Sequence, residues 1–97
     1  MPTYIGLFKW TAQGIQNVKN TVTLVEQLPA ALEKAGGRLV GTWWTQGPYD
    51  IVAVVEWPDD ESASAFMLSV ALAGNVRSET MRAYTAQEMQ RIVQKSH

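Results

Sequence analysis

The spacing of hydrophobic residues changes along the chain and predicts alternating strands and helices. Pro2–Trp10 is rich in aromatic and β-branched residues, so this segment predicts a first strand. From Ile15 to Ala35 the apolar residues recur every three or four positions, which is typical of an amphipathic helix. Because Pro29 removes a backbone donor, we expect this helical region to be broken into a short piece and a longer one.

The rest of the chain predicts a hairpin, a second helix, a fourth strand and a short last helix. Asp59 is placed to cap the second helix, and Thr85 with Glu88 forms a capping-box pattern before the last one. The segments, in chain order, are a strand over Arg38–Gln46, a turn over Gly47–Tyr49, a strand over Asp50–Trp57, a helix from Asp59 to Leu72 or Ala73, a strand over Val76–Tyr84 and a helix after Thr85. This order, βαββαβ with a final helix, predicts an α+β, ferredoxin-like fold in which two helices back a four-stranded antiparallel sheet.

The two strands expected in the middle of this sheet are apolar on both faces. Ile5 and Leu7 alternate with aromatic residues in the first, and Asp50–Trp57 contains an unbroken apolar run. Two helices can cover only one face, so the other face needs a second copy packed sheet to sheet or a ligand enclosed between sheets. The second helix carries no charge between Glu61 and Arg77 and is apolar on two sides. We therefore expect a homodimer or a larger assembly.

Composition narrows the classes of function. With 97 residues the chain predicts one domain over 1–97, and its net charge of -1 does not favour nucleic acid or an anionic membrane. It has no cysteine, and its one histidine is the terminal His97, so we expect no metal site and no cofactor. Neither a secretory signal nor a membrane-spanning run is visible, and we expect a cytoplasmic protein.

Two carboxylates attract attention because each adjoins a strongly apolar strand. Asp50 fits either a turn residue that bonds nearby amides, the interpretation we favour, or a proton acceptor at a pocket mouth with Tyr49 as donor. Glu56 fits either a structural ion pair with a partner on the fourth strand, which we favour, or a substrate-binding group. The residues predicted to bind a ligand are Tyr4, Phe8, Trp44, Tyr49, Asp50 and Glu56.

The motif "GPYD" at 47–50, together with "TYIGLFKWTAQGIQNVK", "LEKAGGRLVGTWWTQGPYD", "EWPDDESA" and "GNVRSETMRAY", resembles the GYD-domain family of small bacterial and archaeal proteins. That family is similar to the dimeric α/β-barrel superfamily, and the resemblance implies two ferredoxin-like protomers with their sheets packed together and a pocket in each half. It implies no activity, because a shared fold does not transfer one. The motif residues Gly47, Tyr49 and Asp50 bring no assigned role with them.

Three functions remain open from the sequence. The leading hypothesis is a homodimeric binding module that holds a small, largely apolar molecule between sheets. The main alternative is a cofactor-free oxygenase or isomerase that uses Asp50 or Glu56 as base and Tyr49 or Tyr4 as donor. The third is a structural assembly unit without a ligand. An enzyme would require one of these carboxylates inside the pocket beside a donor, which the structure can examine.

Overall fold

The computed structural model describes residues 1–96 and contains the predicted α+β, ferredoxin-like fold. The predicted alternation of strands and helices is confirmed, and His97 lies outside the described residues. The elements, in chain order, are β1 (Thr3–Trp10), α1 (Ala12–Gln16), a single 3₁₀ turn η1 (Val18–Asn20), α2 (Thr21–Glu26), α3 (Leu28–Lys34), β2 (Arg38–Trp44), β3 (Ile51–Glu56), α4 (Asp60–Ala73), β4 (Val76–Ala83) and α5 (Ala86–Lys95).

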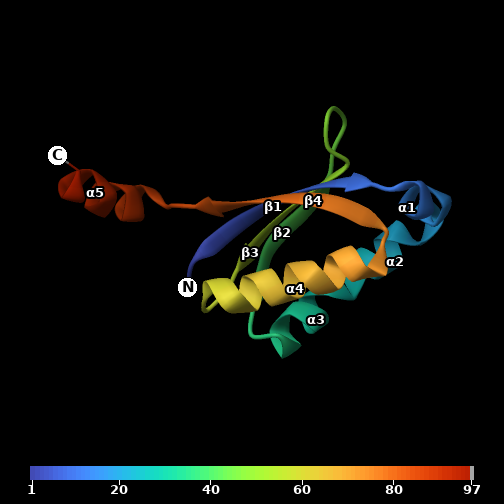
Figure 1. Ribbon diagram of the computed structural model, residues 1–97, viewed down its shortest axis with the longest axis horizontal. Helices are drawn as coiled ribbons and strands as arrows, with labels where there is room; N and C mark the ends of the chain where they lie inside the picture. The colour runs from blue at the N-terminus through green and yellow to red at the C-terminus, as the bar shows by residue number, and fades with distance from the viewer. Residues whose placement is uncertain (97) are drawn as a thin grey trace.

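The four strands form one antiparallel sheet in the order β2-β3-β1-β4, so β1 and β3 are central as predicted. Figure 1 shows α2, α3 and α4 together on one side of this sheet. We call that side the covered face and the other side the open face. Because side chains alternate along a strand, Tyr4 and Phe8 point to the covered face, while Ile5 and Leu7 point to the open face.

The first helical region is broken, as expected, but into four short pieces, α1, η1, α2 and α3, rather than into a short piece and a longer helix. The last break falls before Leu28, and Pro29 occupies the first turn of α3, where a missing backbone donor costs nothing. At the other end of the region, the Thr11 side chain accepts a hydrogen bond from the Gly14 backbone and caps α1. A Cβ on Gly14 would clash with the carbonyl oxygen of Asn75, so only glycine lets α1 approach β4 this closely.

The packed core lies at one end of the covered face. Its buried members are Tyr4, Leu32, Trp57 and Ala63, and the fully buried side chain is Leu32, with 1% of its surface exposed. The ring of Phe66 meets that of Trp57 with centroids 5.3 Å apart. This core fixes α3 and α4 on the sheet by burying Leu32 and Ala63.

Strand β2 contains an irregularity that changes which side chains face the helices. Its pairing with β3 shifts between Leu39 and Gly41, so that one extra residue is accommodated there. Beyond the shift, Thr42 is opposite Ala53 and faces the helices, whereas Trp43 lies on the open face. The Trp43 ring lies over Gly41, where a Cβ would be 2.5 Å from it. This β-bulge therefore decides the face to which each residue at the end of β2 belongs.

Helix α5 lies away from the rest of the domain, at the end of an arm formed by β4 (Figure 1). The predicted capping box is confirmed, because Thr85 and Glu88 exchange side-chain and backbone hydrogen bonds. Arg82 lies 4.6 Å from the ring centre of Tyr84 and 3.4 Å from the Glu88 carboxylate, so it holds the start of the arm. The apolar residues of α5 are exposed and leave its apolar side uncovered, namely Met89, Ile92 and Val93.

Candidate functional site

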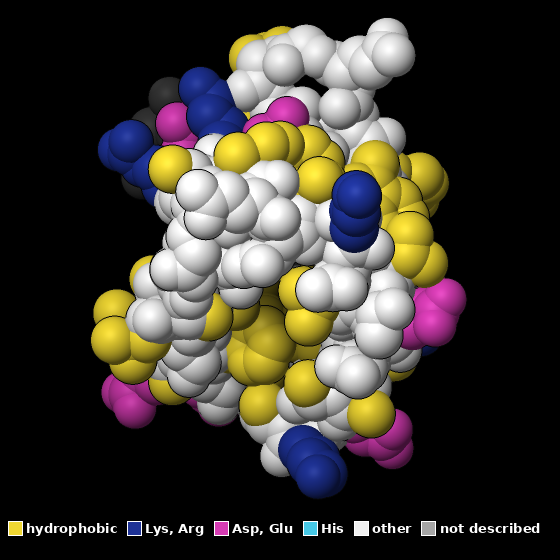
Figure 2. Space-filling model, turned by 90° about the vertical axis from the view of Figure 1, so that its right-hand side faces the viewer, with side chains coloured by type: hydrophobic (Ala, Val, Ile, Leu, Met, Phe, Trp, Pro, Cys, Tyr) yellow, Lys and Arg dark blue, Asp and Glu magenta, His cyan; other side chains and the backbone are white. Residues whose placement is uncertain are grey.

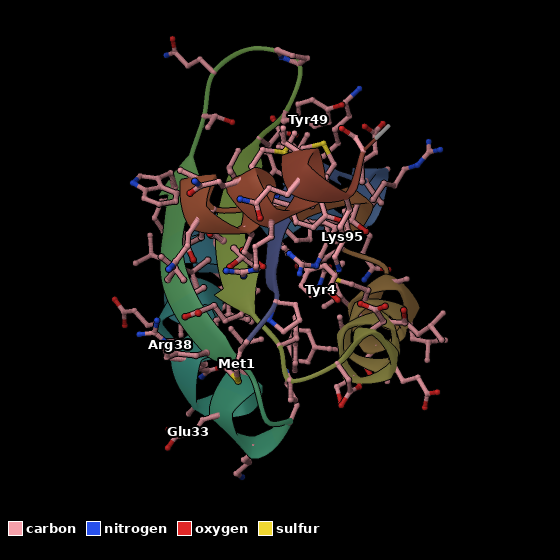
Figure 3. All side chains as sticks on the ribbon, turned by 90° about the vertical axis from the view of Figure 1, so that its left-hand side faces the viewer. Met1, Tyr4, Glu33, Arg38, Tyr49 and Lys95 are labelled. Carbon is pink, nitrogen blue, oxygen red and sulfur yellow. The ribbon has the colours of Figure 1, made fainter. Side chains whose placement is uncertain are left out.

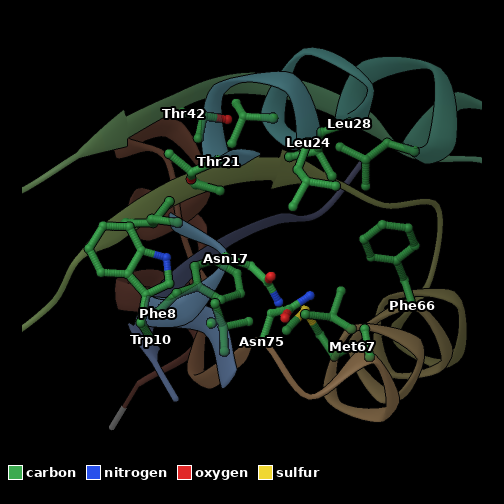
Figure 4. A pocket seen from close by; sticks show the side chains of 18 of the residues that line it. Phe8, Trp10, Asn17, Thr21, Leu24, Leu28, Thr42, Phe66, Met67 and Asn75 are labelled. Carbon is green, nitrogen blue, oxygen red and sulfur yellow. The ribbon is translucent and has the colours of Figure 1, made fainter. Parts of the chain in front are cut away.

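A cavity of about 250 Å³ separates the sheet from the helices on the covered face, beginning beside the packed core, whose Leu32 and Phe66 line it, and extending to Phe8. Figure 4 shows side chains from β1, β2 and the helices directed toward this space, and Figure 2 shows the surface hollowed there, with hydrophobic side chains on the wall. The lining residues are Phe8, Trp10, Gly14, Asn17, Val18, Thr21, Leu24, Val25, Leu28, Leu32, Thr42, Ile51, Ala53, Val55, Phe66, Met67, Val70, Ala73, Asn75 and Val76.

The wall is apolar and uncharged. On the sheet side Phe8 and Ala53 form the floor, and on the helix side Leu28 and Met67 close over it. Among residues 1–96, none of those that line the cavity is charged. A space of this kind favours a neutral ligand, since a charge inside it would lose its hydration without meeting an opposite charge.

Polar side chains reach the cavity at a few places, and those of Thr21 and Asn75 are hydrogen-bonded. Asn75 accepts a hydrogen bond from Gln13 at 3.0 Å, and Thr21 accepts one from the indole of Trp44 at 3.0 Å. The hydroxyl oxygen of Thr42 is buried, and within the described residues it has no hydrogen-bond partner. An unsatisfied buried hydroxyl is costly, so this atom distinguishes Thr42 from the other polar groups.

The predicted ligand-binding residues do not gather at one site. Phe8 lines the cavity, while Trp44 lies outside its wall and contacts it only through Thr21. Tyr4 belongs to the packed core, where its hydroxyl donates to the Asp60 carboxylate. This hydrogen bond, together with burial, raises the pKa of Tyr4 above its ordinary value. Figure 3 shows Tyr4 and Tyr49 at different places along the sheet.

Asp50 ties the β2–β3 hairpin to the end of β1. Its carboxylate accepts a hydrogen bond from the Trp10 backbone at 2.9 Å. Its own backbone donates to Phe8 at 2.8 Å and accepts from Thr45 at 2.8 Å. The carboxylate thus bonds an amide, as the structural interpretation expects, although the amide belongs to β1 rather than to the turn. Asp50 does not line the cavity.

Tyr49 lies across the end of the open face. Its hydroxyl donates to Glu79 on β4 at 2.7 Å, and the ammonium of Lys9 lies 5.3 Å from its ring centre. The hydrogen bond to Glu79 raises the pKa of Tyr49. The hairpin is therefore attached twice, by Asp50 to β1 and by Tyr49 to β4. Both motif residues thus have a structural role, each on a different neighbouring strand.

The predicted location of the ion-pair partner of Glu56 is wrong. Its partner is Arg38 on β2, whose Nε donates to the carboxylate at 2.8 Å, and not a residue of β4. The reason is the strand order: β3 lies between β2 and β1, so β4 is two strands away, whereas Arg38 is directly opposite Glu56. Figure 3 shows Arg38 on the outer strand β2. Glu56 lies on the open face and is not in the cavity wall.

The comparison with known protein families resolves the resemblance seen in the sequence. The family model of the GYD domain matches residues 4–93. The chain belongs to the GYD-domain family. It is also 33% identical over 84 residues to a protein of Thermus thermophilus named "Glutamine synthetase and cystathionine beta-lyase binding protein", a match that covers 86% of this chain and 88% of that protein.

Two further observations concern the described part of this GYD-domain chain. No helix within residues 1–96 combines the length and apolar character needed to cross a membrane. In the same residues, no three acidic or histidine side chains gather in a group that could hold a metal ion. The features that remain as candidates for function are the apolar cavity and the open sheet face. The motif residues Tyr49 and Asp50 hold the β2–β3 hairpin against β4 and β1.

Sequence reasoning about this GYD-domain chain missed the helical half of the cavity and Thr42. Leu24, Leu28 and Met67 follow ordinary helical spacing, so nothing marked them as cavity residues rather than core. The sequence does contain a signal for the position of Thr42. Gly41 interrupts the apolar alternation of β2, and an isolated glycine within a strand often accompanies a bulge. Recognising that bulge would have moved Thr42 to the covered face.

Proposed function

We propose that this GYD-domain protein is a homo-oligomeric binding protein that takes a small, largely apolar molecule into the cavity between sheet and helices. The observation that carries the proposal is the uncharged apolar wall around about 250 Å³. The ligand was expected between two sheets, whereas the cavity lies on the covered face of one sheet. The binding space is thus formed within one chain, and a second copy is left to cover the open face.

The open face supports self-association. Its centre consists of half-buried aliphatic residues, and Trp43 and Met81 add exposed apolar surface, 53% and 47% exposed. Lys9 and Glu79 place both signs of charge near its edge. A surface with an apolar centre and an edge of mixed charge can meet a second copy of itself across a twofold axis. We propose a sheet-to-sheet homodimer on this basis.

The enzyme alternative receives less support from the geometry. Asp50 is bonded to the Trp10 backbone, and Glu56 is paired with Arg38. Tyr4 and Tyr49 donate to other carboxylates, those of Asp60 and Glu79. None of the four residues proposed as base or donor borders the cavity. Catalysis by these groups would require them to exchange these contacts, whereas binding requires only the existing space.

The test is direct binding of an apolar probe together with a variant that fills the cavity. Wild-type protein should bind naphthalene with one molecule per chain in a calorimetric or fluorescence titration. Val70→Phe adds a ring to the cavity wall, so it should abolish binding while the melting temperature stays the same or rises. Leu68→Phe is the matched control, because Leu68 lies on the same helix and is 67% exposed.

The proposal fails if wild-type protein binds no apolar probe, or if Val70→Phe binds as well as wild type. A loss of binding in both helix variants would point to a general disturbance of α4. A loss in Val70→Phe alone ties binding to the cavity. The mass of each variant by light scattering shows whether the assembly has been preserved.

A second candidate function is the binding of other proteins, favoured by the name of the Thermus thermophilus relative. The open face and the exposed apolar side of α5 supply surfaces for such a contact. Sedimentation of this chain with purified glutamine synthetase, and separately with cystathionine beta-lyase, from the same organism tests it. Comigration with either enzyme at micromolar concentration would support the candidate, and independent sedimentation from both would reject it.

A further inference from the structure

The polar side chains that a ligand in the cavity could meet lie toward one end of it. Asn75 directly precedes Val76, which pairs with the last residue of β1. Asn17 is the C-terminal cap of α1, the helix that contacts Asn75. Thr21 is hydrogen-bonded to Trp44, the last residue of β2. Three polar lining residues from different elements therefore gather where β1 and β2 end.

The opposite end of the cavity is apolar. It borders the packed core and is lined by Leu28, Leu32, Val55 and Phe66. The hydroxyl oxygen of Thr42 is buried within the wall, so it offers a ligand no polar contact. A ligand that carried a polar group to this end would lose the hydration of that group without gaining a hydrogen bond.

The polar end is also the open end. Asn17 is exposed and Asn75 is half-buried, whereas Leu32 at the other end is 1% exposed. Figure 4 shows both amide side chains directed toward the cavity. The oxygen of the Asn75 side chain accepts from Gln13, but within residues 1–96 its nitrogen and the Asn17 amide have no hydrogen-bond partner. The mouth therefore has unused donors and an unused acceptor.

The cavity is longer than it is wide. On β3 it is lined by the alternate residues Ile51, Ala53 and Val55, which span about 13 Å at the usual rise of a strand. On α4 the lining residues from Phe66 to Ala73 span about 10 Å. A sphere of the same volume, about 250 Å³, would be only about 8 Å across, so the space is elongated along the strands. An extended chain fits such a space.

We propose that the cavity takes an alkyl or acyl compound of medium chain length, apolar end first, and holds its single oxygen-bearing head group at the mouth beside Asn17 and Asn75. This inference rests on the proposed ligand-binding function and adds the class and orientation of the ligand. The chain leaves water for the apolar wall, while the head group accepts hydrogen bonds from the amides and stays in contact with water.

Volume sets the length of the chain. A dry apolar cavity of about 150 Å³ holds benzene, which has six carbons. In proportion, about 250 Å³ holds a chain of roughly eight to ten carbons. A compound such as 1-octanol therefore meets the requirements of volume, elongated shape and one polar end.

The experiment titrates the wild-type chain with 1-octanol and with 4-octanol, which has the same formula but carries its hydroxyl within the chain. We expect 1-octanol to bind about 10-fold more tightly, because the hydroxyl of 4-octanol would lie against the apolar wall. Across 1-butanol, 1-hexanol and 1-octanol, the Kd should fall by about 4-fold for each added CH2 group.

Variants at the two ends test the orientation. Asn17→Leu removes the amide with little change of shape and should lower the ratio of the 4-octanol Kd to the 1-octanol Kd by roughly 3-fold. Asn20→Leu, at an exposed asparagine outside the cavity wall, is the matched control and should leave the ratio unchanged. Leu28→Phe fills the inner end, so it should weaken 1-octanol more than 1-butanol. Melting curves show that each variant is folded.

The outcomes distinguish this inference from the function on which it rests. If wild type binds neither naphthalene nor 1-octanol, the ligand-binding proposal fails and the chain-shaped ligand fails with it. If naphthalene binds but the two octanols bind equally, the cavity accepts ligands without orienting a chain. A ratio that is the same in Asn17→Leu and Asn20→Leu would refute the position of the head group. Equal weakening of 1-butanol and 1-octanol in Leu28→Phe would refute the inward position of the chain end.

Discussion

The two central strands of the sheet are apolar on both faces, but the two faces differ in how they are covered. The covered face is packed around Tyr4 and Trp57 at one end and hollow beside Phe8 at the other. The open face has no helix over it, and its central residues, such as Ile5 and Val54, stay half-buried only through contact with their neighbours. An apolar pattern therefore shows that a face needs cover, and it does not show what kind of cover.

The distribution of charge indicates which kind of cover each face of the sheet needs. The cavity wall on the covered face contains no charged residue among those described, which suits a small neutral molecule. The open face carries the Arg38–Glu56 pair and the Tyr49–Glu79 hydrogen bond beside its apolar centre, as a protein interface does at its rim. One face is suited to a small ligand, and the other to a macromolecular partner.

The largest expected effect comes from placing a charge in the centre of the open face. If a second copy covers this face, Val54→Arg buries an unpaired cation and should weaken self-association by at least about 100-fold. Light scattering at low micromolar concentration should then give the monomer mass of 10.8 kDa. Val22→Arg on α2, at a residue 52% exposed, should keep the mass of wild type. A monomeric wild type would remove the basis of this prediction.

The next effect compares the packed and hollow ends of the covered face. Leu32→Ala truncates a core side chain that is 1% exposed, where the packed core borders the cavity, and should lower the free energy of unfolding by about 3 kcal/mol. Leu24→Ala, at a cavity-lining residue 50% exposed, should cost about 1 kcal/mol or less. Urea unfolding at one chain concentration measures both. Equal losses would mean that the face is not divided into a packed end and a hollow end.

A smaller effect is expected at Asp50, which ties the β2–β3 hairpin to the end of β1. Asp50→Ala removes the acceptor of the Trp10 backbone donor and should cost about 1 to 2 kcal/mol. Asp50→Asn keeps an acceptor oxygen and should cost less than about 0.5 kcal/mol. Neither change should alter the affinity for an apolar ligand, because Asp50 is not in the cavity wall. Loss of ligand binding in Asp50→Asn with the fold intact would show that the charge itself is required.

The smallest effect is a dependence on alkaline pH that separates the two tyrosines. Hydrogen bonding to Asp60 raises the pKa of Tyr4 above 10.0, so its contribution to stability is complete below that pH and is lost as the pH rises through the folded-state pKa. Tyr4→Phe should flatten this part of the melting-temperature profile. Tyr49→Phe should change it less, because the Tyr49–Glu79 hydrogen bond is exposed to solvent. Equal slopes in wild type and Tyr4→Phe would refute the assignment.

Much of the fold could be predicted because local rules and long-range order agree. The caps at Asp59 and Thr85 and the central position of β1 and β3 all follow from residue type and spacing. The partner of Glu56 could not be found in this way, because the relevant pairing depends on register across strands. Once β2 is paired with β3 in this register, Arg38 lies opposite Glu56, and the ion pair between them follows directly.

The candidate site was predictable only in part, for a physical reason. Aromatic residues such as Tyr4 and Phe8 share one face of one strand, yet Tyr4 lies in the packed core and Phe8 in the cavity wall. The difference depends on how far α2 and α4 stand from the sheet, which helical periodicity does not encode. Thr42 adds a second difficulty, because its face depends on a bulge that shifts the alternation by one position.

That bulge shifts the alternation of side chains between the two faces of β2 by one residue. Upstream of Val40 the odd-numbered Leu39 faces the helices, and downstream of it the even-numbered Thr42 and Trp44 lie on that side. Deleting Val40, a single codon, would remove the extra residue and leave Leu39 opposite Val55 and Gly41 opposite Val54, so Thr42 would stay on the side of the helices and Trp43 on the open face. At this point the strand can therefore lose one residue without exchanging the faces of Thr42 and Trp43, whereas a deletion within a regular strand would turn every later side chain to the opposite face.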